Sequence, residues 1–284
     1  MSASTLFIGV VSYEGSRFAI NQGESGLAQT LSRAIAGTQV QVLTQNLFDE
    51  AGGLVGPGDV QASLSAELAV ERRWSAFLDR PKDISSVVKR TARNVTRLWQ
   101  RARPPSPKSV RRLFNIEMSH LDLMRQGLDS RAPWVLILED DAWSSDVDDL
   151  TLGLAQLMET ASTPESFGYA NLSASFSPQE LGIDHLLQQS RLTWNGTTQR
   201  QILRSSLPVT NTVCAILYSA AFLSDLLEAM NQLPTKPIVP IDWKLNCALM
   251  TLFDRGRVDD TTCVFVQPSP IEQLSMQSNG ILPG

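Results

Sequence analysis

The first fifty residues restrict the possible folds most strongly. Residues 6 to 11 form a continuous apolar run rich in β-branched side chains, which is typical of a strand buried on both faces. A helix with an apolar side is predicted between Gly26 and Gly37, and residues 39 to 43 alternate between apolar and polar as a second strand does. This succession of strand, helix and strand predicts a right-handed crossover and a parallel, Rossmann-like sheet.

The same alternation continues along the chain, so the predicted fold class is α/β. Further helices are expected at residues 64 to 78, 110 to 128, 148 to 161, 219 to 231 and 241 to 253, and further strands at 134 to 138, 168 to 173, 211 to 218 and 261 to 267, with a hairpin around Asn195 and Gly196. Gly127 or a residue close to it is expected to end the helix at 110 to 128. A chain of 284 residues can bury a large core. We expect one domain over residues 1–284, a mixed and mostly parallel sheet flanked by helices, with a basic helical insertion at about 80–112.

Composition excludes several classes of protein. Hydrophobic residues make up 43% of the chain and charged residues 19%, which is typical of a globular protein rather than a disordered or membrane-embedded one. The cysteines, Cys214, Cys247 and Cys263, form no CxxC pair, which favours reduced thiols over a disulfide framework. The amino-terminal apolar run is short and lacks a basic flank, so we expect a first strand, no signal peptide and a cytoplasmic location.

Charge is distributed unevenly around the formal total of −5. Residues 80 to 112 hold eleven Lys or Arg and one acid, a net charge of +10, and the remaining residues carry −15. Within this segment, residues 84 to 102 have the spacing of a basic amphipathic helix with Trp99 as an aromatic anchor. Such a helix could hold the protein peripherally on the anionic inner face of a membrane. The alternatives are a helix packed on the core with solvated charges and, less favoured because the body is acidic, nucleic-acid binding.

Three consecutive acids directly follow a buried strand. Trp134 to Leu138 are apolar, and Glu139, Asp140 and Asp141 come next. Ligands of open α/β sheets bind at the carboxyl ends of strands, and crowded carboxylates there need compensation. Mg²⁺ or Mn²⁺ carrying a diphosphate would supply it. The alternative is a solvated acidic loop that caps the next helix, which is our interpretation of Asp146 and Asp148.

Four motifs together resemble one known family. The string Leu138-Glu-Asp-Asp-Ala142, preceded by Ser119-His120 on a helix, is similar to the Leu-Glu-Asp-Asp and Ser-His motifs of the family 25 glycosyltransferases, which include lipopolysaccharide and collagen galactosyltransferases. Pro240-Ile-Asp242 resembles the family's Pro-x-Asp motif at the start of a late helix, and Pro270-Ile-Glu-Gln273 resembles its carboxyl-terminal region.

The resemblance implies a GT-A fold in which the three acids act as a DxD motif. Asp141 would hold Mn²⁺ (or Mg²⁺) against the donor diphosphate, Glu139 would assist, and Asp140 would reach toward the ribose. Ser12, Tyr13 and Arg17 follow the first strand and are candidates for donor binding as a hydroxyl, a stacking ring and a phosphate ligand. An ordinary loop with a surface arginine is the alternative for these three residues.

An inverting transfer needs a carboxylate that accepts the proton of the acceptor hydroxyl. The family analogy nominates Asp242, whose alternative role is the N-cap of its helix, and Glu272 is the reserve candidate. His120 is expected to be a structural, hydrogen-bonding histidine behind the site, and His185 a surface one. A further metal ligand would then come from Glu272, Gln273 or water.

The predicted function is transfer of a sugar from a nucleotide-diphosphate sugar, with UDP favoured, to a glycan or lipid-linked acceptor of the cell envelope. A metal-dependent nucleotidyltransferase would share the acid cluster and release pyrophosphate instead. A non-catalytic, membrane-associated relative is the third hypothesis, because Arg112 to Ile116 replace the Gly-Glu-Ile-Gly-Cys that precedes Ser-His in the family.

Overall fold

The computed structural model describes residues 5–12, 21, 23–44, 107–160, 166–173, 178, 183–207, 209–210, 212–233 and 240–276. The predicted helices at 64–78 and 84–102, and the donor-binding candidates Tyr13 and Arg17, lie outside the described residues. So does most of the basic segment.

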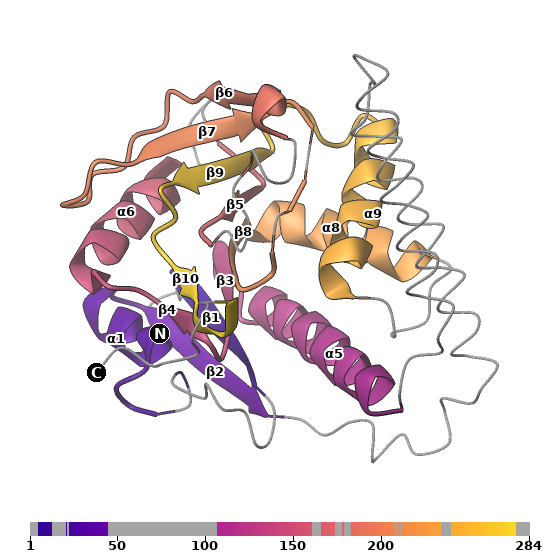
Figure 1. Ribbon diagram of the computed structural model, residues 1–284, viewed down its shortest axis with the longest axis horizontal. Coiled ribbons are helices and arrows are strands. Elements are labelled where there is room, and N and C mark those ends of the chain that lie inside the picture. Colours follow the sequence, from indigo (N-terminus) through magenta and orange to yellow (C-terminus); the bar gives the residue numbers. More distant parts are fainter. Residues whose placement is uncertain are drawn as a thin grey trace.

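One large sheet organises the described chain (Figure 1). It contains β1 (Leu6–Ser12), β2 (Thr38–Thr44), β3 (Trp134–Glu139), β5 (Tyr169–Asn171), β6 (Leu187–Gln189), β7 (Gln201–Ser205), β8 (Ala215–Ser219) and β9 (Cys263–Gln267), in the order β2-β1-β3-β8-β5-β9-β7-β6. β1 pairs in parallel with both β2 and β3, which confirms the predicted parallel start. β8 and β7 run against the other strands of this described sheet, so the sheet is mixed.

Helices cover both faces of the sheet. They are α1 (Leu27–Ala34), α5 (Pro107–Asp129), α6 (Val147–Glu159), α8 (Ala220–Gln232) and α9 (Ile241–Asp254). Figure 1 shows α1 and α6 on one side of the sheet and α5, α8 and α9 on the other. Along β3 the side chains alternate between these two layers: Leu136 and Leu138 join the α1 and α6 core, whereas Val135 and Ile137 join the α5, α8 and α9 core. The α/β fold class is therefore confirmed.

Helix α5 lies unusually close to β1 and β3. A Cβ at Gly127 would come within 2.6 Å of Val135, and one at Gly9 within 3.0 Å of Leu123, so both glycines permit the approach. Gly127 was predicted to end this helix, but the helix continues to Asp129 and Gly127 is a packing position inside it. The close approach fixes which residues of α5 reach the carboxyl ends of the strands.

The hairpin predicted around Asn195 and Gly196 is wrong as a tight turn. β6 and β7 do pair antiparallel, but residues 190 to 200 connect them as a long loop that packs on α6. Buried Asp149 on α6 accepts hydrogen bonds from Trp194 Nε1 (3.2 Å) and Thr198 N (2.8 Å) and pairs with Arg200 Nε at 2.7 Å. Because the loop satisfies a buried carboxylate, it folds onto the helix instead of turning sharply.

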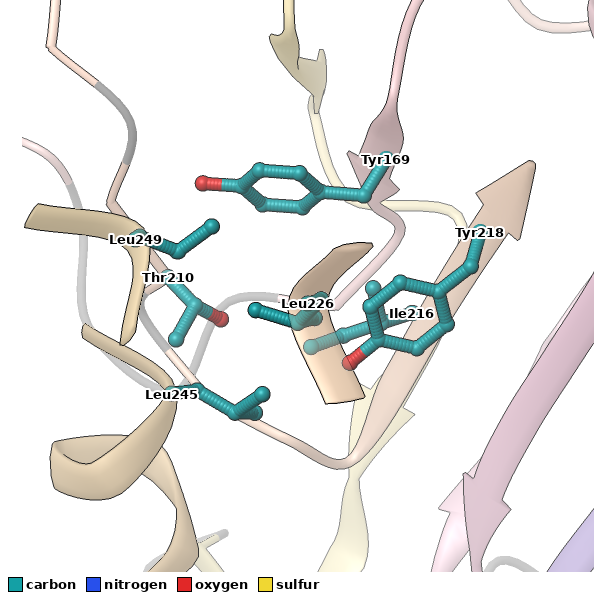
Figure 2. A pocket seen from close by; sticks show the side chains of 7 residues that line it. All are labelled: Tyr169, Thr210, Ile216, Tyr218, Leu226, Leu245 and Leu249. Carbon is teal, nitrogen blue, oxygen red and sulfur yellow. The ribbon is translucent and has the colours of Figure 1, made fainter. Parts of the chain in front are cut away.

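A small gap lies inside the core, between the sheet and two helices. The gap between β5, β8, α8 and α9 has no room even for a water molecule, so it is far smaller than a ligand pocket. Figure 2 shows the Tyr169 and Tyr218 rings facing Leu226, Leu245 and Leu249 across it. This gap is a packing imperfection of the core.

In the described residues, no helix is long and apolar enough to span a membrane.

Gly153→Ala tests how tightly the 190–200 loop packs on α6. Alanine normally stabilises a helix interior by about 1 kcal/mol relative to glycine, but a Cβ here would lie 2.1 Å from the Trp194 ring. We expect a net loss of about 1–3 kcal/mol in the free energy of unfolding, measured by urea denaturation with circular dichroism. Leu152→Ala, at a half-exposed neighbouring position, should change it by less than about 0.5 kcal/mol. A gain in Gly153→Ala would contradict the packing.

Candidate functional site

The acid cluster, Glu139, Asp140 and Asp141, lies where β3 ends in the middle of the sheet. Asp140 is 6% exposed and Asp141 5% exposed, while the Glu139 side chain is 18% exposed. The solvated acidic loop considered as an alternative is therefore wrong for these residues. Burial raises the pKa of the Asp141 carboxyl, and the charges of Glu139 and Asp140 act in the same direction. Asp146, by contrast, is the N-cap of α6, as predicted, and accepts a hydrogen bond from Asp149 N.

One amide side chain holds the turn that carries the three acids. Asn21 is fully buried, and its Nδ2 donates to the carbonyl oxygens of Ala142 (2.8 Å) and Glu139 (3.2 Å), with that of Asp140 at 3.5 Å. Its Oδ1 accepts from Leu27 N at 2.7 Å, at the start of α1. Asn21 thus satisfies both the turn and a helix terminus whose N-cap, Gly26, has no side chain to do so.

The end of β1 meets the acid cluster directly. Because β1 and β3 are parallel and Val11 is in register with Glu139, Ser12 lies beside the acids. Its Oγ donates to Asp140 Oδ2 at 3.1 Å. The structure therefore brings together two of the residues proposed for donor binding.

A segment near the carboxyl terminus covers the cluster from the other side. β10 (Glu272–Gln273) pairs antiparallel with β4 (Ala142–Trp143), which directly follows the acids. Gln273 Nε2 donates to Glu139 Oε2 at 2.9 Å, and Ser275 N donates to Asp141 Oδ2 at 3.3 Å. Gln273 was considered as a further ligand, and its amide does reach the site. Glu272 is exposed, and strand alternation points it away from the side on which Gln273 meets Glu139.

His120 contacts the cluster from α5. Its Nε2 lies 3.7 Å from Glu139 Oε1, its side chain is 1% exposed, and within the described residues this nitrogen has no hydrogen-bond partner. The prediction of a histidine behind the site is right about its place, but the expected hydrogen bond is not made by Nε2. His185 is exposed, as predicted.

Cys214, just before β8, adds a sulfur atom. Glu139, Asp141 and Cys214 each offer one ligand atom, and these three atoms lie within 4.8 Å of one another. Burial, together with the nearby charges of Glu139 and Asp141, raises the pKa of the Cys214 thiol well above its usual range. The two carboxylates are of the ligand type that Mn²⁺ and Mg²⁺ take, and the thiol is not.

A second buried charge pair lies one helical turn away from His120. Glu117 of α5 pairs with Lys244 of α9, and both side chains are at most 7% exposed. Burial raises the pKa of Glu117 to about 7, although Lys244 acts in the opposite direction. Because the pair joins α5 to α9, it helps to fix the helix that carries His120.

Asp242 stands in the first turn of α9 and is half-buried. The N-cap of this helix is Pro240, so the alternative of Asp242 as N-cap is wrong. Four residues later on the same face, Asn246 bonds the backbone N and O of Thr210 at 2.8 and 3.2 Å. Thr212, two residues after Thr210, donates a hydrogen bond from its Oγ1 to Gln273 Oε1 at 3.4 Å. Within the described residues, the contacts to the acid cluster that we observe do not involve Asp242. They come from β1, Asn21, α5, the residue before β8 and residues 273 to 275.

Known proteins supply no independent identification. A scan against models of protein families gives no match, and a search of curated proteins finds none with significant similarity. The case for a function rests on the residues and their geometry.

Asn21→Ala should loosen the acid turn and the start of α1 together. It leaves buried carbonyl oxygens and one helix N–H without their partner, so we expect a loss of about 2–3 kcal/mol in the free energy of unfolding, measured by denaturant titration. The matched control is Gln41→Ala, an exposed amide on β2, which should cost less than about 0.5 kcal/mol. Equal effects of the two variants would show that Asn21 does not hold the turn.

Proposed function

We propose that the chain is a metal-dependent glycosyltransferase of GT-A type, which transfers a sugar from a nucleotide-diphosphate sugar, with UDP favoured, to a glycan or lipid-linked acceptor. One observation carries the proposal: three of the motifs that resemble family 25 meet at a single carboxylate. Glu139 of the Leu-Glu-Asp-Asp string lies 3.7 Å from His120 of the Ser-His motif and accepts a hydrogen bond from Gln273 of the carboxyl-terminal motif.

These motifs are far apart in the sequence, so their meeting is not a consequence of chain proximity. His120 precedes Glu139 by 19 residues, and Gln273 follows it by 134. The meeting point is the carboxyl end of a central strand, where ligands of α/β sheets bind. A mixed sheet with helices on both faces is compatible with the GT-A fold.

Glu139 and Asp141 would bind Mn²⁺ or Mg²⁺, and no described lysine or arginine pairs with either carboxylate. The bound cation would neutralise the diphosphate that leaves the sugar. Ser12 and Asp140, already in contact, would position the ribose at the edge formed by β1 and β3. Asn21 would keep the carboxylates in place, because it fixes the backbone that carries them.

The proton of the acceptor hydroxyl needs a base. Asp242 is our first candidate, because α9 is tied through Asn246, Thr210 and Thr212 to Gln273 at the site. Glu272, exposed beside Gln273, is the second. With Asp242 as the base, the acceptor hydroxyl and the sugar would have to approach from the α9 side of the cluster, because Glu272 points away from Glu139.

Donor binding separates this proposal from a purely structural acid cluster. Isothermal titration should show UDP binding that depends on Mn²⁺, and a screen of UDP-sugars should give Mn²⁺-dependent release of UDP. Asp141→Asn should weaken Mn²⁺-dependent binding by roughly 100-fold, because it removes a charged ligand. Asp148→Asn removes the same charge from an exposed position of α6 and should leave binding unchanged.

Absence of Mn²⁺-dependent UDP binding by the folded wild-type protein would contradict the proposal. Release of pyrophosphate rather than UDP, identified by mass spectrometry, would favour the nucleotidyltransferase instead.

A further inference from the structure

The possible metal-ligand atoms around Glu139 are of several chemical types, and a DxD motif uses only the carboxylate oxygens among them. Besides carboxylates, the cluster contains Cys214, whose Sγ lies 4.0 Å from Asp141 Oδ1 and whose side chain is fully buried. Sulfur and imidazole nitrogen favour borderline ions such as Zn²⁺ and Co²⁺ over Mg²⁺ and Mn²⁺. The thiol donates a hydrogen bond to Asp141 Oδ1, which a bond to a cation would replace.

His120 supplies an independent reason to expect a ligand. Its Nε2 is buried, has no hydrogen-bond partner among the described residues, and is directed at the acid cluster. A buried polar nitrogen without a partner costs about 1–3 kcal/mol unless something compensates it. Coordination to a cation between His120 and Glu139 would provide that compensation.

Glu139, Asp141 and Cys214 each offer a ligand atom within 4.8 Å of the others, whereas His120 approaches Glu139 but lies outside that group. On a tetrahedral Zn²⁺, with bonds of about 2.0–2.3 Å, a nitrogen and an oxygen lie about 3.3 Å apart and a sulfur and an oxygen about 3.6 Å apart. The corresponding distances here are 3.7 Å from His120 to Glu139 and 4.0 Å from Cys214 to Asp141. These two pairs would each close by about 0.4 Å on a shared ion. His120 would in addition have to turn toward Asp141 and Cys214, because its nitrogens lie outside their group.

We propose that Cys214 and His120 join Glu139 and Asp141 in a mixed sulfur, nitrogen and oxygen site that binds Zn²⁺ or a similar borderline cation. On binding, the Cys214 thiol releases its proton to solvent and its thiolate bonds the ion. The inference rests on the part of the proposed function that makes the acid cluster a metal site, but it does not depend on sugar transfer. It predicts that Zn²⁺ and Mn²⁺ compete for the same carboxylates.

Co²⁺ is the probe, because a cobalt–thiolate bond produces a charge-transfer band in the near ultraviolet. Titration of metal-free, full-length protein with Co²⁺ should produce this band with a stoichiometry of one ion, and Zn²⁺ should abolish it. Cys214→Ser should remove the band and weaken Co²⁺ binding by at least about tenfold. His120→Asn should keep the band but weaken binding to a similar extent.

Cys263→Ser and Cys247→Ser are the matched controls. Both side chains are buried, as that of Cys214 is, but neither belongs to the group formed by Glu139, Asp141 and Cys214, so both variants should keep the band. Circular dichroism confirms that each variant is folded. A Co²⁺-loaded wild-type protein without the band, or a band lost in a control and kept in Cys214→Ser, overturns the sulfur ligand. Unchanged affinity in His120→Asn overturns the nitrogen ligand.

The result of the cobalt titration can be told apart from failure of the proposed function. A protein that shows the cobalt–thiolate band but never binds UDP would contradict the glycosyltransferase and support this site. A protein that binds UDP with Mn²⁺ and shows no band would do the reverse.

Discussion

The side-chain amide of Asn21 holds the backbone turn that carries three carboxylates, and most of the site depends on these hydrogen bonds. The turn follows five buried strand residues, and buried backbone groups must find hydrogen-bond partners inside the protein. Asn21 supplies them and also caps α1, which couples the first crossover of the sheet to the position of the acids. Like-charge repulsion within the turn would otherwise favour its opening.

The position of His120 beside the acid cluster follows from the dimensions of a helix and a strand. Gly127 of α5 lies against Val135, and His120 lies near Glu139. Seven helical residues advance about 10 Å, and four strand residues advance about 13 Å. Because α5 runs against β3 and packs closely on it, these similar spans bring the imidazole to the end of the strand. The same helix face carries Glu117, whose buried pairing with Lys244 fixes α5 against α9.

The apolar pattern was sufficient to predict the central strands β1 and β3, because burial on both faces produces continuous runs such as residues 6 to 11 and 134 to 138. It was also sufficient to locate the acid cluster, since charges that interrupt such a run are visible in the sequence. It could not predict Asn21 or Cys214, whose roles depend on groups that lie 121 and 73 residues away along the chain. Gly127 was misread as a helix end, since a helical glycine selected for close packing looks identical to a terminator in sequence.

The central claim is that Glu139 and Asp141 hold a divalent cation beside a nucleotide diphosphate. Anomalous diffraction at the manganese edge, from crystals grown with Mn²⁺ and UDP, tests it most directly. The account predicts one manganese peak within bonding distance of both carboxylates, with the UDP diphosphate on its open side and the ribose near Ser12 and Asp140. Ordered UDP bound elsewhere, or an acid cluster without a manganese peak in the presence of both ligands, would contradict it.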